Sequence, residues 1–323
     1  MRFTVEELAA AADLVHGQMS PTPQYHWPGL SAATGAEVWV KHENHAPTGA
    51  FKVRGGITFM DWLRRDHPES PGICTAPRGN HGQSQARAAT AAGLRALIYV
   101  PRGNSVEKNA AMRGYGGALV EFGEDFDTAR VEAMRVAEAE GLTVVPPFHR
   151  ELVRGVATYG YELFSALKDL DTVYVPIGCG SGICGTILAR DAFGLRTEVV
   201  GVVSDHAQTA KLSYEAGALV ETNSARTFAD GMAVRVPVKD AFDIYERGAA
   251  RIVSVSEEDI AAAIRLYYTA THNLAEGAGA APLAALMQER ERMAGKKVGV
   301  ILSGGNIDMG WFRTVLEGGV PEV

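Results

Sequence analysis

Four short stretches of this sequence combine glycines with side chains that can do chemistry. They are PTGAFKVRGG (47–56), APRGNHGQS (76–84), GCGSGICG (178–185) and SGGNID (303–308). The chain as a whole is rich in glycine, with 36 in 323 residues, against an average of about 7%. Glycine lets the backbone turn sharply or approach a ligand closely. These stretches are therefore the candidates for a binding site.

The first stretch places Lys52 between small residues and an aromatic residue. An amine in an apolar, glycine-lined setting loses hydration, which lowers its pKa and favours the free amine that a Schiff-base lysine requires. Taken alone, however, Lys52 beside Arg54 is more often a solvated surface pair. The first stretch by itself favours that simpler interpretation.

The stretch GCGSGICG follows the apolar run TVYVPI and leads into a helical pattern. Converging backbone N–H groups and a helix N-terminus favour a bound anion, so this loop predicts a phosphate site. Gly180, Gly182 and Gly185 also satisfy GxGxxG, and Asp205 follows 20 residues later at the end of the next predicted strand. This is the dinucleotide fingerprint, so a nicotinamide-dependent oxidoreductase is one candidate. The loop alone leaves open which phosphate it binds.

The remaining two stretches have a simple and a functional interpretation each. Asn80 and His81 follow Gly79 at a predicted helix start, where such residues often serve as caps or turns. They can equally form a nest of amides that holds a carboxylate, with Asn80 bonding a ligand hydroxyl. Ser303 follows a strand and can be only a turn residue. All four stretches in order at one sheet edge predict a shared ligand site.

The elements that must position these stretches alternate along the chain. Short β-branched apolar runs are typical of strands buried on both faces of a parallel sheet; they lie at 37–43, 72–76, 95–101, 117–123, 172–178, 198–204 and 297–305. Alanine-rich segments with helical spacing lie at 82–93, 128–141 and 257–271. This alternation predicts a doubly wound α/β fold, whose ligands bind at the carboxyl ends of the strands.

Composition excludes several classes of protein. With 46% hydrophobic residues the chain can bury a sizeable core, and its length indicates about two domains or lobes. The net charge of -7 argues against nucleic-acid partners. Three cysteines without a CxxC pair indicate a reduced, cytoplasmic setting. Glu6 and Glu7 make the first residues an amphipathic helix rather than a secretory signal, and we expect no membrane span and no metal site.

Taken together, the motifs resemble the fold-type II pyridoxal-phosphate family, specifically its threonine/serine dehydratase and serine racemase branch. The motifs that carry the resemblance, in the order of the family, are PTP (21–23), VKHENHAPTGAFKVRGG (40–56), PRGNHGQS (77–84), GCGSGICG (178–185), FADGMAV (228–234), LAEGAGAAPLAAL (274–286) and ILSGGNID (301–308). The combination is specific, although no single piece is. A nicotinamide enzyme explains one loop and leaves Lys52, Asn80 and Ser303 without roles.

The resemblance implies that Lys52 is the catalytic residue and holds pyridoxal 5'-phosphate through its amine. It implies further cofactor contacts from Phe51, Asn80, Gly178, Cys179, Gly180, Ser181, Gly182, Glu276 and Ser303, and substrate contacts from Arg78, Gly79, Asn80 and His81. Ser303 would face the pyridine nitrogen. A hydroxyl does not keep that nitrogen protonated as a carboxylate does, which favours prompt loss of a β-substituent over transamination.

The resemblance further implies a two-lobed α/β homodimer that dehydrates and deaminates a 3-hydroxy amino acid to a 2-oxo acid and ammonia. A small substrate domain (72–141) would be inserted into a large cofactor domain (1–71 and 142–323). The alternatives are an amino-acid racemase and a non-catalytic binding protein on the same scaffold. Arg78 stands where racemases have a serine, and an arginine cannot serve as that base. The intact lysine, asparagine and serine set argues against a mere binding protein.

Some positions depart from the family pattern. Ala50 replaces the usual serine before Phe51. Val203 and Thr209 stand where the branch commonly has a glutamate and an aspartate that hold a divalent cation, so we expect activity to depend little on magnesium or calcium. The sequence ends 15 residues after Asp308. We therefore expect no C-terminal regulatory domain, no control by isoleucine, and a catabolic role.

Overall fold

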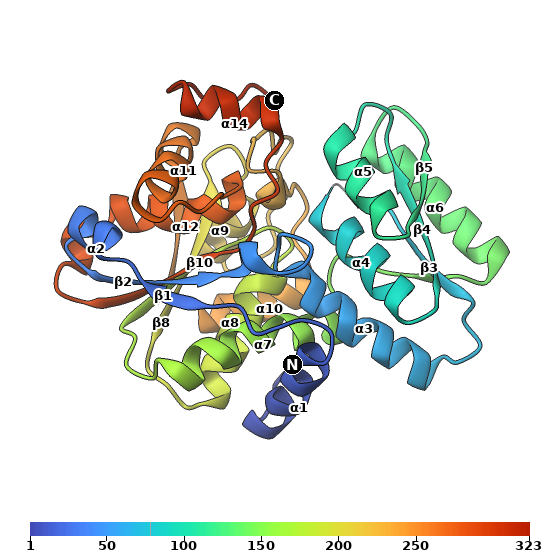
Figure 1. Ribbon diagram of the computed structural model, residues 1–323, viewed down its shortest axis with the longest axis horizontal. Helices are drawn as coiled ribbons and strands as arrows, with labels where there is room; N and C mark the ends of the chain where they lie inside the picture. Colours follow the sequence, from blue (N-terminus) through green and yellow to red (C-terminus); the bar gives the residue numbers. More distant parts are fainter. Residues whose placement is uncertain (78) are drawn as a thin grey trace.

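The computed structural model describes residues 1–77 and 79–323, and its strands form two sheets that lie in separate parts of the molecule (Figure 1). The larger sheet has the order β1-β2-β10-β7-β8-β9, and the smaller has the order β5-β4-β3-β6. Among the strands of the described residues, β1 alone runs antiparallel, on the edge beside β2. This arrangement confirms the predicted α/β fold with two parallel sheets.

The strands of the larger sheet are β1 (Gln24–His26), β2 (Glu37–His42), β7 (Thr172–Pro176), β8 (Glu198–Ser204), β9 (Arg251–Val255) and β10 (Lys297–Leu302). Those of the smaller sheet are β3 (Gly72–Thr75), β4 (Arg95–Val100), β5 (Ala118–Glu121) and β6 (Thr143–Val144). All seven apolar runs predicted as strands are strands. The three that the pattern missed, β1, β6 and β9, are short strands at the sheet edges, and β1 and β9 are only partly buried.

The helices are α1 (Val5–His16), α2 (Pro28–Thr34), α3 (Lys52–Asp66), α4 (Asn80–Ala91), α5 (Val106–Gly114), α6 (Phe126–Glu140), α7 (Arg150–Ala166), α8 (Ser181–Ala192), α9 (Thr209–Ala216), α10 (Lys239–Gly248), α11 (Glu257–Thr271), α12 (Gly277–Gln288), α13 (Arg290–Met293) and α14 (Met309–Leu316), with 3-10 turns η1 (Glu43–His45) and η2 (Asp230–Met232). The predicted segment 257–271 coincides with α11. The other two predicted helices, α4 and α6, begin two residues earlier than expected.

Alternating residues of β7 show how the larger sheet is covered on both faces. Val173 and Val175 pack in the cluster with α7, α8 and α10, whereas Tyr174 packs in the cluster with α11 and α12. All three side chains are fully buried. A strand buried on both sides needs apolar residues at every position, and this requirement explains the continuous apolar run in the sequence.

Two glycines allow α3 and α7 to cross at close range. A Cβ atom on Gly55 of α3 would lie 2.7 Å from the carbonyl oxygen of Leu152. A Cβ atom on Gly155 of α7 would lie 2.2 Å from the carbonyl oxygen of Arg54. The backbones therefore approach more closely than any larger residue permits. This contact holds the helix that begins at Lys52.

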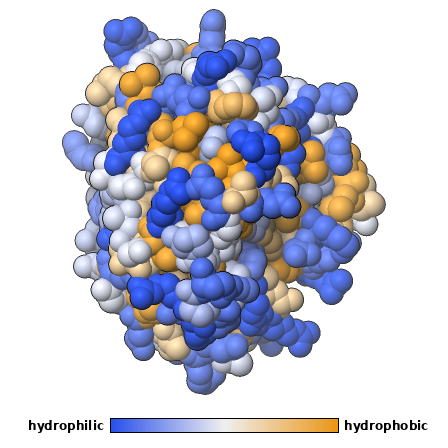
Figure 2. Space-filling view, turned by 90° about the vertical axis from the view of Figure 1, so that its right-hand side faces the viewer, coloured by the Kyte–Doolittle hydropathy of each residue, from blue (hydrophilic) through white to orange (hydrophobic). Residues whose placement is uncertain are grey.

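The molecular surface is mixed in character. Seen from the side of the smaller sheet, small groups of hydrophobic residues lie among hydrophilic ones (Figure 2). Helices α5 and α6 carry exposed apolar residues, including Val106, Val131 and Met134. In the described part of the chain, no helix has the length and apolar character needed to cross a bilayer.

Candidate active site

Lys52 is the first residue of α3 and is joined to the start of α8. Its Nζ atom donates a hydrogen bond to Ser181 Oγ over 2.9 Å. The backbone N–H of Phe51 donates to the carbonyl oxygen of Ser303 over 3.0 Å. Ser84 of α4 donates to the carbonyl oxygen of Lys52 over 2.6 Å. The structure thus brings residues from all four predicted stretches to one place.

The setting of Lys52 favours its uncharged form. Burial lowers the pKa of the Lys52 ammonium, and nearby Cys179 and Glu276 oppose this shift without cancelling it. The ring of Phe51 lies 4.9 Å from the Lys52 Nζ atom. Loss of hydration destabilises the ammonium, so a free amine is reached at a lower pH than for an exposed lysine. A free amine is the reactive form in Schiff-base chemistry.

The glycine loop before α8 forms a cradle for an anion. Gly180 has a left-handed backbone (φ 96°) and precedes a helix that no side chain caps. A Cβ atom on Gly178 would lie 2.1 Å from the carbonyl oxygen of Gly231, so only glycine can stand there. The N–H groups of the first helical turn have no partners within the helix and favour negative charge. This donor set, next to an amine, fits the phosphate and aldehyde groups of pyridoxal phosphate.

Asn80, the first residue of α4, joins two of the other stretches. Its Nδ2 atom donates to both carboxylate oxygens of Glu276, over 2.8 and 3.0 Å. Its Oδ1 atom accepts from Asn306 Nδ2 over 2.8 Å. Asn306 was missed by the sequence analysis, although it lies within the stretch that drew attention to Ser303. The amide of Asn80 is therefore held in one orientation.

Glu276 is buried, with 3% of its surface exposed. Burial and then the charge of Asp230 raise the pKa of the Glu276 carboxyl to about 7, against the opposing effects of Lys108 and Asn80. A Cβ atom on Gly304 would lie 2.7 Å from Glu276 Oε1. Glu276 thus lies against the loop that follows β10 and can exchange a proton near neutral pH.

The predicted substrate-binding residues are placed only in part. Gly79 lies near the side chains of Lys108 and Asp230. Burial, and then the charge of Lys52, lower the pKa of the His81 imidazole to about 3, so His81 is neutral. Its Nε2 atom is buried and has no hydrogen-bond partner within the described residues. Arg78 lies outside the described residues.

An ion pair beside Gly79 joins the part of the chain with the smaller sheet to the larger one. Lys108 of α5 forms this pair with Asp230 of η2. Nearby, Ser105 Oγ donates to Asp308 Oδ1 over 2.8 Å. The Lys108 side chain is 7% exposed and that of Asp230 is 27% exposed. Nothing in the local sequence distinguishes Lys108 from a surface lysine, so the sequence does not predict this pair.

Arg54 is not half of a solvated surface pair, and that interpretation was wrong. The Arg54 side chain is completely buried, and it contacts Glu43 and Glu162. Two carboxylates compensate its charge inside the protein. The residues that do so lie outside the local sequence on which the interpretation rested.

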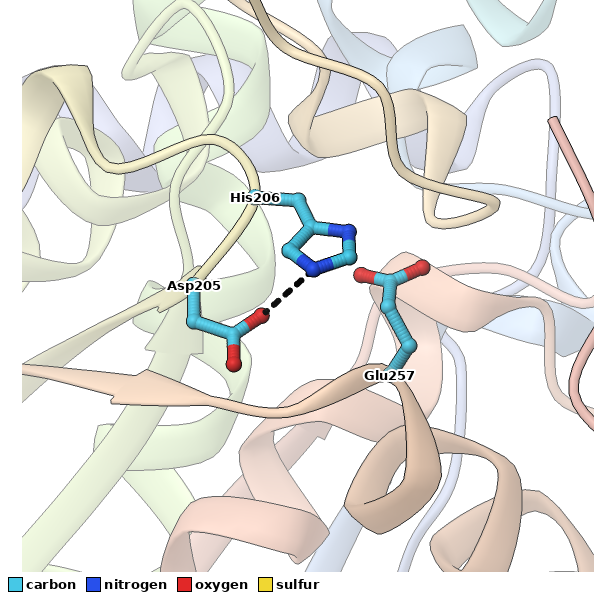
Figure 3. A group of neighbouring side chains, drawn as sticks. All are labelled: Asp205, His206 and Glu257. Carbon is cyan, nitrogen blue, oxygen red and sulfur yellow. Dashed lines mark ion pairs between the residues drawn. The ribbon is translucent and has the colours of Figure 1, made fainter.

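Val203 and Thr209, the positions at which we expected no cation ligands, make other contacts. Val203 is buried in β8, and Thr209 Oγ1 donates to the carbonyl oxygen of Val234 over 2.9 Å. Close by, Asp205, His206 and Glu257 form a group (Figure 3). The Glu257 carboxylate already accepts hydrogen bonds from Ser204, Thr227 and the backbone N–H of Phe228. These bonds give Glu257 a structural role.

A family model described as pyridoxal-phosphate dependent enzyme matches residues 15–304. The chain therefore belongs to the family of pyridoxal-phosphate dependent enzymes. Membership also decides against the nicotinamide alternative, because the cofactor of this family is pyridoxal phosphate.

Individual relatives are also similar over nearly the whole chain. An L-threonine ammonia-lyase of Geobacter sulfurreducens is 35% identical over 311 residues, covering 96% of this chain and 77% of the relative. A serine racemase of Schizosaccharomyces pombe is 30% identical over 307 residues, covering 95% of each chain. The processed form of threonine deaminase isoform 2 from Solanum lycopersicum superposes with a TM-score of 0.89 at 29% identity, covering 98% of this chain and 94% of that one.

Proposed function

We propose that this protein is a lyase that dehydrates and deaminates a 3-hydroxy amino acid, of the threonine, serine or 3-hydroxyaspartate type, releasing a 2-oxo acid and ammonia. The observation that carries this proposal is the hydrogen bond between Lys52 and Ser181, which sets an amine with a lowered pKa beside an anion cradle. The similarity to the threonine ammonia-lyase of Geobacter sulfurreducens supports the choice of reaction.

The residues assigned to the cofactor are those that surround this pair. Lys52 holds the aldehyde carbon of pyridoxal 5'-phosphate, and Gly178, Cys179, Gly180, Ser181 and Gly182 hold its phosphate. Phe51, Asn80, Glu276 and Ser303 line the ring. When bound, the cofactor supplies an electron sink for the negative charge left on the α-carbon of an attached amino acid.

The protein's own groups then move the protons. With cofactor and substrate bound, the Lys52 amine would remove the α-proton, and its lowered pKa favours the unprotonated form that this task requires. Gly79, Asn80 and His81 at the start of α4 bind the substrate carboxylate through their backbone N–H groups. The β-hydroxyl takes up a proton and leaves as water, which creates a double bond between the α- and β-carbons. The β-carbon then gains a proton, and addition of water at the α-carbon releases ammonia and the 2-oxo acid. Atoms therefore balance without an external oxidant or reductant.

Racemisation is the second candidate, because a serine racemase is among the relatives. A racemase needs a second base on the opposite face of the substrate. The residue before Gly79 is Arg78, whose guanidinium stays protonated and cannot accept that proton. We therefore rank the lyase first, with Arg78 as a contact to the substrate.

The proposal extends to assembly and location. It includes a cytoplasmic homodimer, with a substrate domain (72–141) inserted into the cofactor domain (1–71 and 142–323). The helix α4 that carries Asn80 would then contribute to the site from the smaller domain.

A substrate screen tests the proposed reaction. Threonine, serine, 3-hydroxyaspartate and 3-phenylserine are incubated with the purified, cofactor-loaded protein, and 2-oxo acid and ammonia are measured together with the chirality of the remaining amino acid. Equal amounts of 2-oxo acid and ammonia from at least one substrate support the lyase. Inversion of the α-carbon without ammonia would establish the racemase instead.

A further inference from the structure

Capping and helix propensity contribute little to the stability of the first turn of α3, which carries Lys52. Phe51 stands at the N-cap and no side chain caps the helix. Two glycines, Gly55 and Gly56, follow within the next turn, and a glycine inside a helix costs about 1 kcal/mol relative to alanine. They are required by close contacts, since a Cβ atom on Gly56 would lie 2.6 Å from Ser84 Oγ. Something other than helix propensity must therefore fix the position of Lys52.

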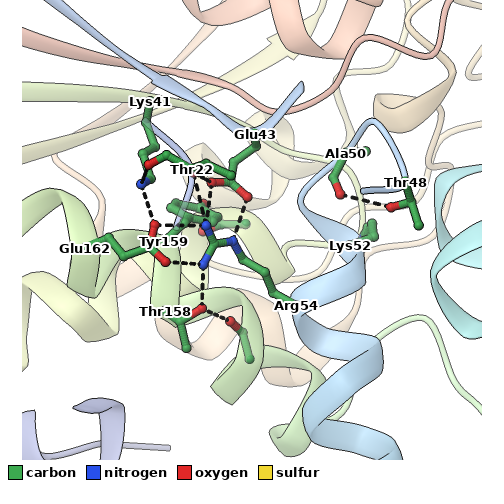
Figure 4. Close-up of polar contacts among 12 residues, drawn as sticks. Thr22, Lys41, Glu43, Thr48, Ala50, Lys52, Arg54, Thr158, Tyr159 and Glu162 are labelled. Atoms are coloured by element: carbon green, nitrogen blue, oxygen red, sulfur yellow. Dashed lines mark hydrogen bonds and ion pairs between the residues drawn. The ribbon is translucent and has the colours of Figure 1, made fainter. Parts of the chain in front are cut away.

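Arg54 provides a dense set of contacts on the other side of the same turn. Successive helical residues are turned by about 100°, so residues two apart point in nearly opposite directions. The Arg54 side chain extends from α3 towards Glu43 and Glu162, away from Lys52 (Figure 4). Its Nε atom donates to Glu43 Oε2 over 2.7 Å, and its Nη1 atom donates to Glu162 Oε1 over 2.6 Å and to Thr158 over 2.9 Å. The guanidinium is thus held in a single orientation.

The charges around Arg54 balance one another. Lys41 Nζ donates to Glu162 Oε2 over 2.5 Å, so two buried cations face two buried carboxylates. Burial opposes the charge on Arg54, but Glu43 and Glu162 outweigh it and raise the pKa of the guanidinium. Removing one member leaves a buried charge without compensation. These four residues, Lys41, Glu43, Arg54 and Glu162, are called the Arg54 cluster below.

The Arg54 cluster ties the turn to three other parts of the chain. Glu43 belongs to η1, Glu162 to α7, and Thr22, which receives a hydrogen bond from Arg54 Nη2 over 3.0 Å, to the N-terminal segment. His16 of α1 contacts Glu162 Oε1 over 2.7 Å. The anchor therefore spans elements that are distant in sequence.

We infer that Arg54 is a positioning residue for Lys52: the Arg54 cluster anchors the first turn of α3 from behind and fixes the Lys52 amine beside Ser181. This inference rests on the proposed role of Lys52. A lysine that must both hold the cofactor and remove a proton tolerates little displacement, since a shift of about 1 Å can reduce a rate about 100-fold.

The test compares Arg54→Lys with Arg65→Lys on the same helix. Arg65 is exposed, and its ion pairs within the described residues are with Asp61 and Asp66 at the surface. Lysine keeps the charge of Arg54 but cannot bond both carboxylates in the same geometry. For each variant we would measure kcat and KM per chain that carries the cofactor on Lys52, and amide hydrogen exchange across 50–60 in the cofactor-free protein.

For Arg54→Lys we expect kcat to fall by about 10- to 100-fold and KM to change by less than about threefold. Amide exchange across 50–60 should be faster, and Arg65→Lys should match the wild type in every measurement. Unchanged kcat per loaded chain with unchanged exchange would overturn the inference, even if the Tm fell. If Arg54→Lys does not fold, Glu43→Gln, which keeps the shape of the side chain, is held to the same criteria. The exchange measurement needs no cofactor, so its result stands even if the proposed function fails.

Discussion

Lys52 and Ser181, 129 residues apart in the sequence, are joined by a hydrogen bond of 2.9 Å between the first residue of α3 and the first residue of α8. The bond brings the only catalytic group proposed for the reaction to the helix end proposed for the cofactor phosphate.

Replacing Ser181 by alanine should weaken cofactor binding. In the proposed site the Ser181 hydroxyl donates to the cofactor phosphate, and a hydrogen bond to a charged group contributes about 1.5–3 kcal/mol, which corresponds to a loss of affinity of about tenfold or more. Titration of the cofactor-free protein with pyridoxal 5'-phosphate measures the change. The exposed Ser224→Ala serves as the control. An unchanged affinity in Ser181→Ala would remove Ser181 from the site.

Gly180→Ala should damage the glycine loop more than a comparable change elsewhere. Gly180 has a φ of 96°, and a Cβ atom there would lie 2.6 Å from that of Ala241. Gly194 has a φ of 63° but open space around it. For Gly194→Ala we expect the free energy of unfolding to fall only by the backbone cost of about 1–2 kcal/mol. For Gly180→Ala we expect a larger fall and weak cofactor binding. Urea unfolding of both variants measures these changes. Equal losses of unfolding free energy would show that the loop can move to make room for the added methyl group.

The raised pKa of Glu276 makes stability depend on pH in a defined direction. The folded chain binds more protons at this carboxyl than the unfolded chain between its ordinary pKa of 4.5 and about 7. The contribution of this carboxyl to folding stability is therefore complete at low pH and is lost as pH rises through about 7. Relative to Glu276→Gln, the cofactor-free wild type should lose up to about 3 kcal/mol between about pH 4.5 and pH 8.

His81 makes a comparison with the variant necessary. Its pKa is lowered to about 3 from 6.5, so its contribution has the opposite sign and is lost as pH falls below about 6.5. Only the difference in unfolding free energy between the wild type and Glu276→Gln isolates the contribution of the Glu276 carboxyl. Parallel curves of unfolding free energy against pH would mean that Glu276 ionises normally.

Chelation should leave the activity nearly unchanged. Neither Val203 nor Thr209 offers a carboxylate, and Glu257 is engaged by its own neighbours. We expect the cofactor-loaded enzyme to keep its rate in excess chelator. A strong loss that magnesium restores would reveal a cation site that this account does not contain.

The sequence predicts the fold better than the connections within the site. The strands β7, β8 and β10 are buried on both faces, so the positions between their ends are apolar and the run is easily recognised. The edge strand β9 is only partly buried, and Arg251 and Ser254 interrupt its apolar pattern. Burial of the central strands is what made them predictable.

The site shows the same contrast. Lys52, Gly180 and Ser303 were found because glycine-rich loops follow recognisable strands. The partners of Arg54 were not, because Glu43 and Glu162 lie 11 and 108 residues away and only the folded chain brings them together. The pairing of Asn80 with Glu276 likewise joins residues 196 positions apart. Local sequence patterns identify the reactive residues, whereas the residues that hold them in position are apparent only in the folded structure.

Borohydride reduction of the purified protein tests the central claim most directly, because it fixes a Schiff base permanently to the lysine that forms it. We predict a yellow protein that loses its colour on reduction and then carries the cofactor's mass on the peptide that contains Lys52. Lys52→Ala should show neither this mass nor turnover. Attachment at another lysine, or full turnover by Lys52→Ala, would contradict the account.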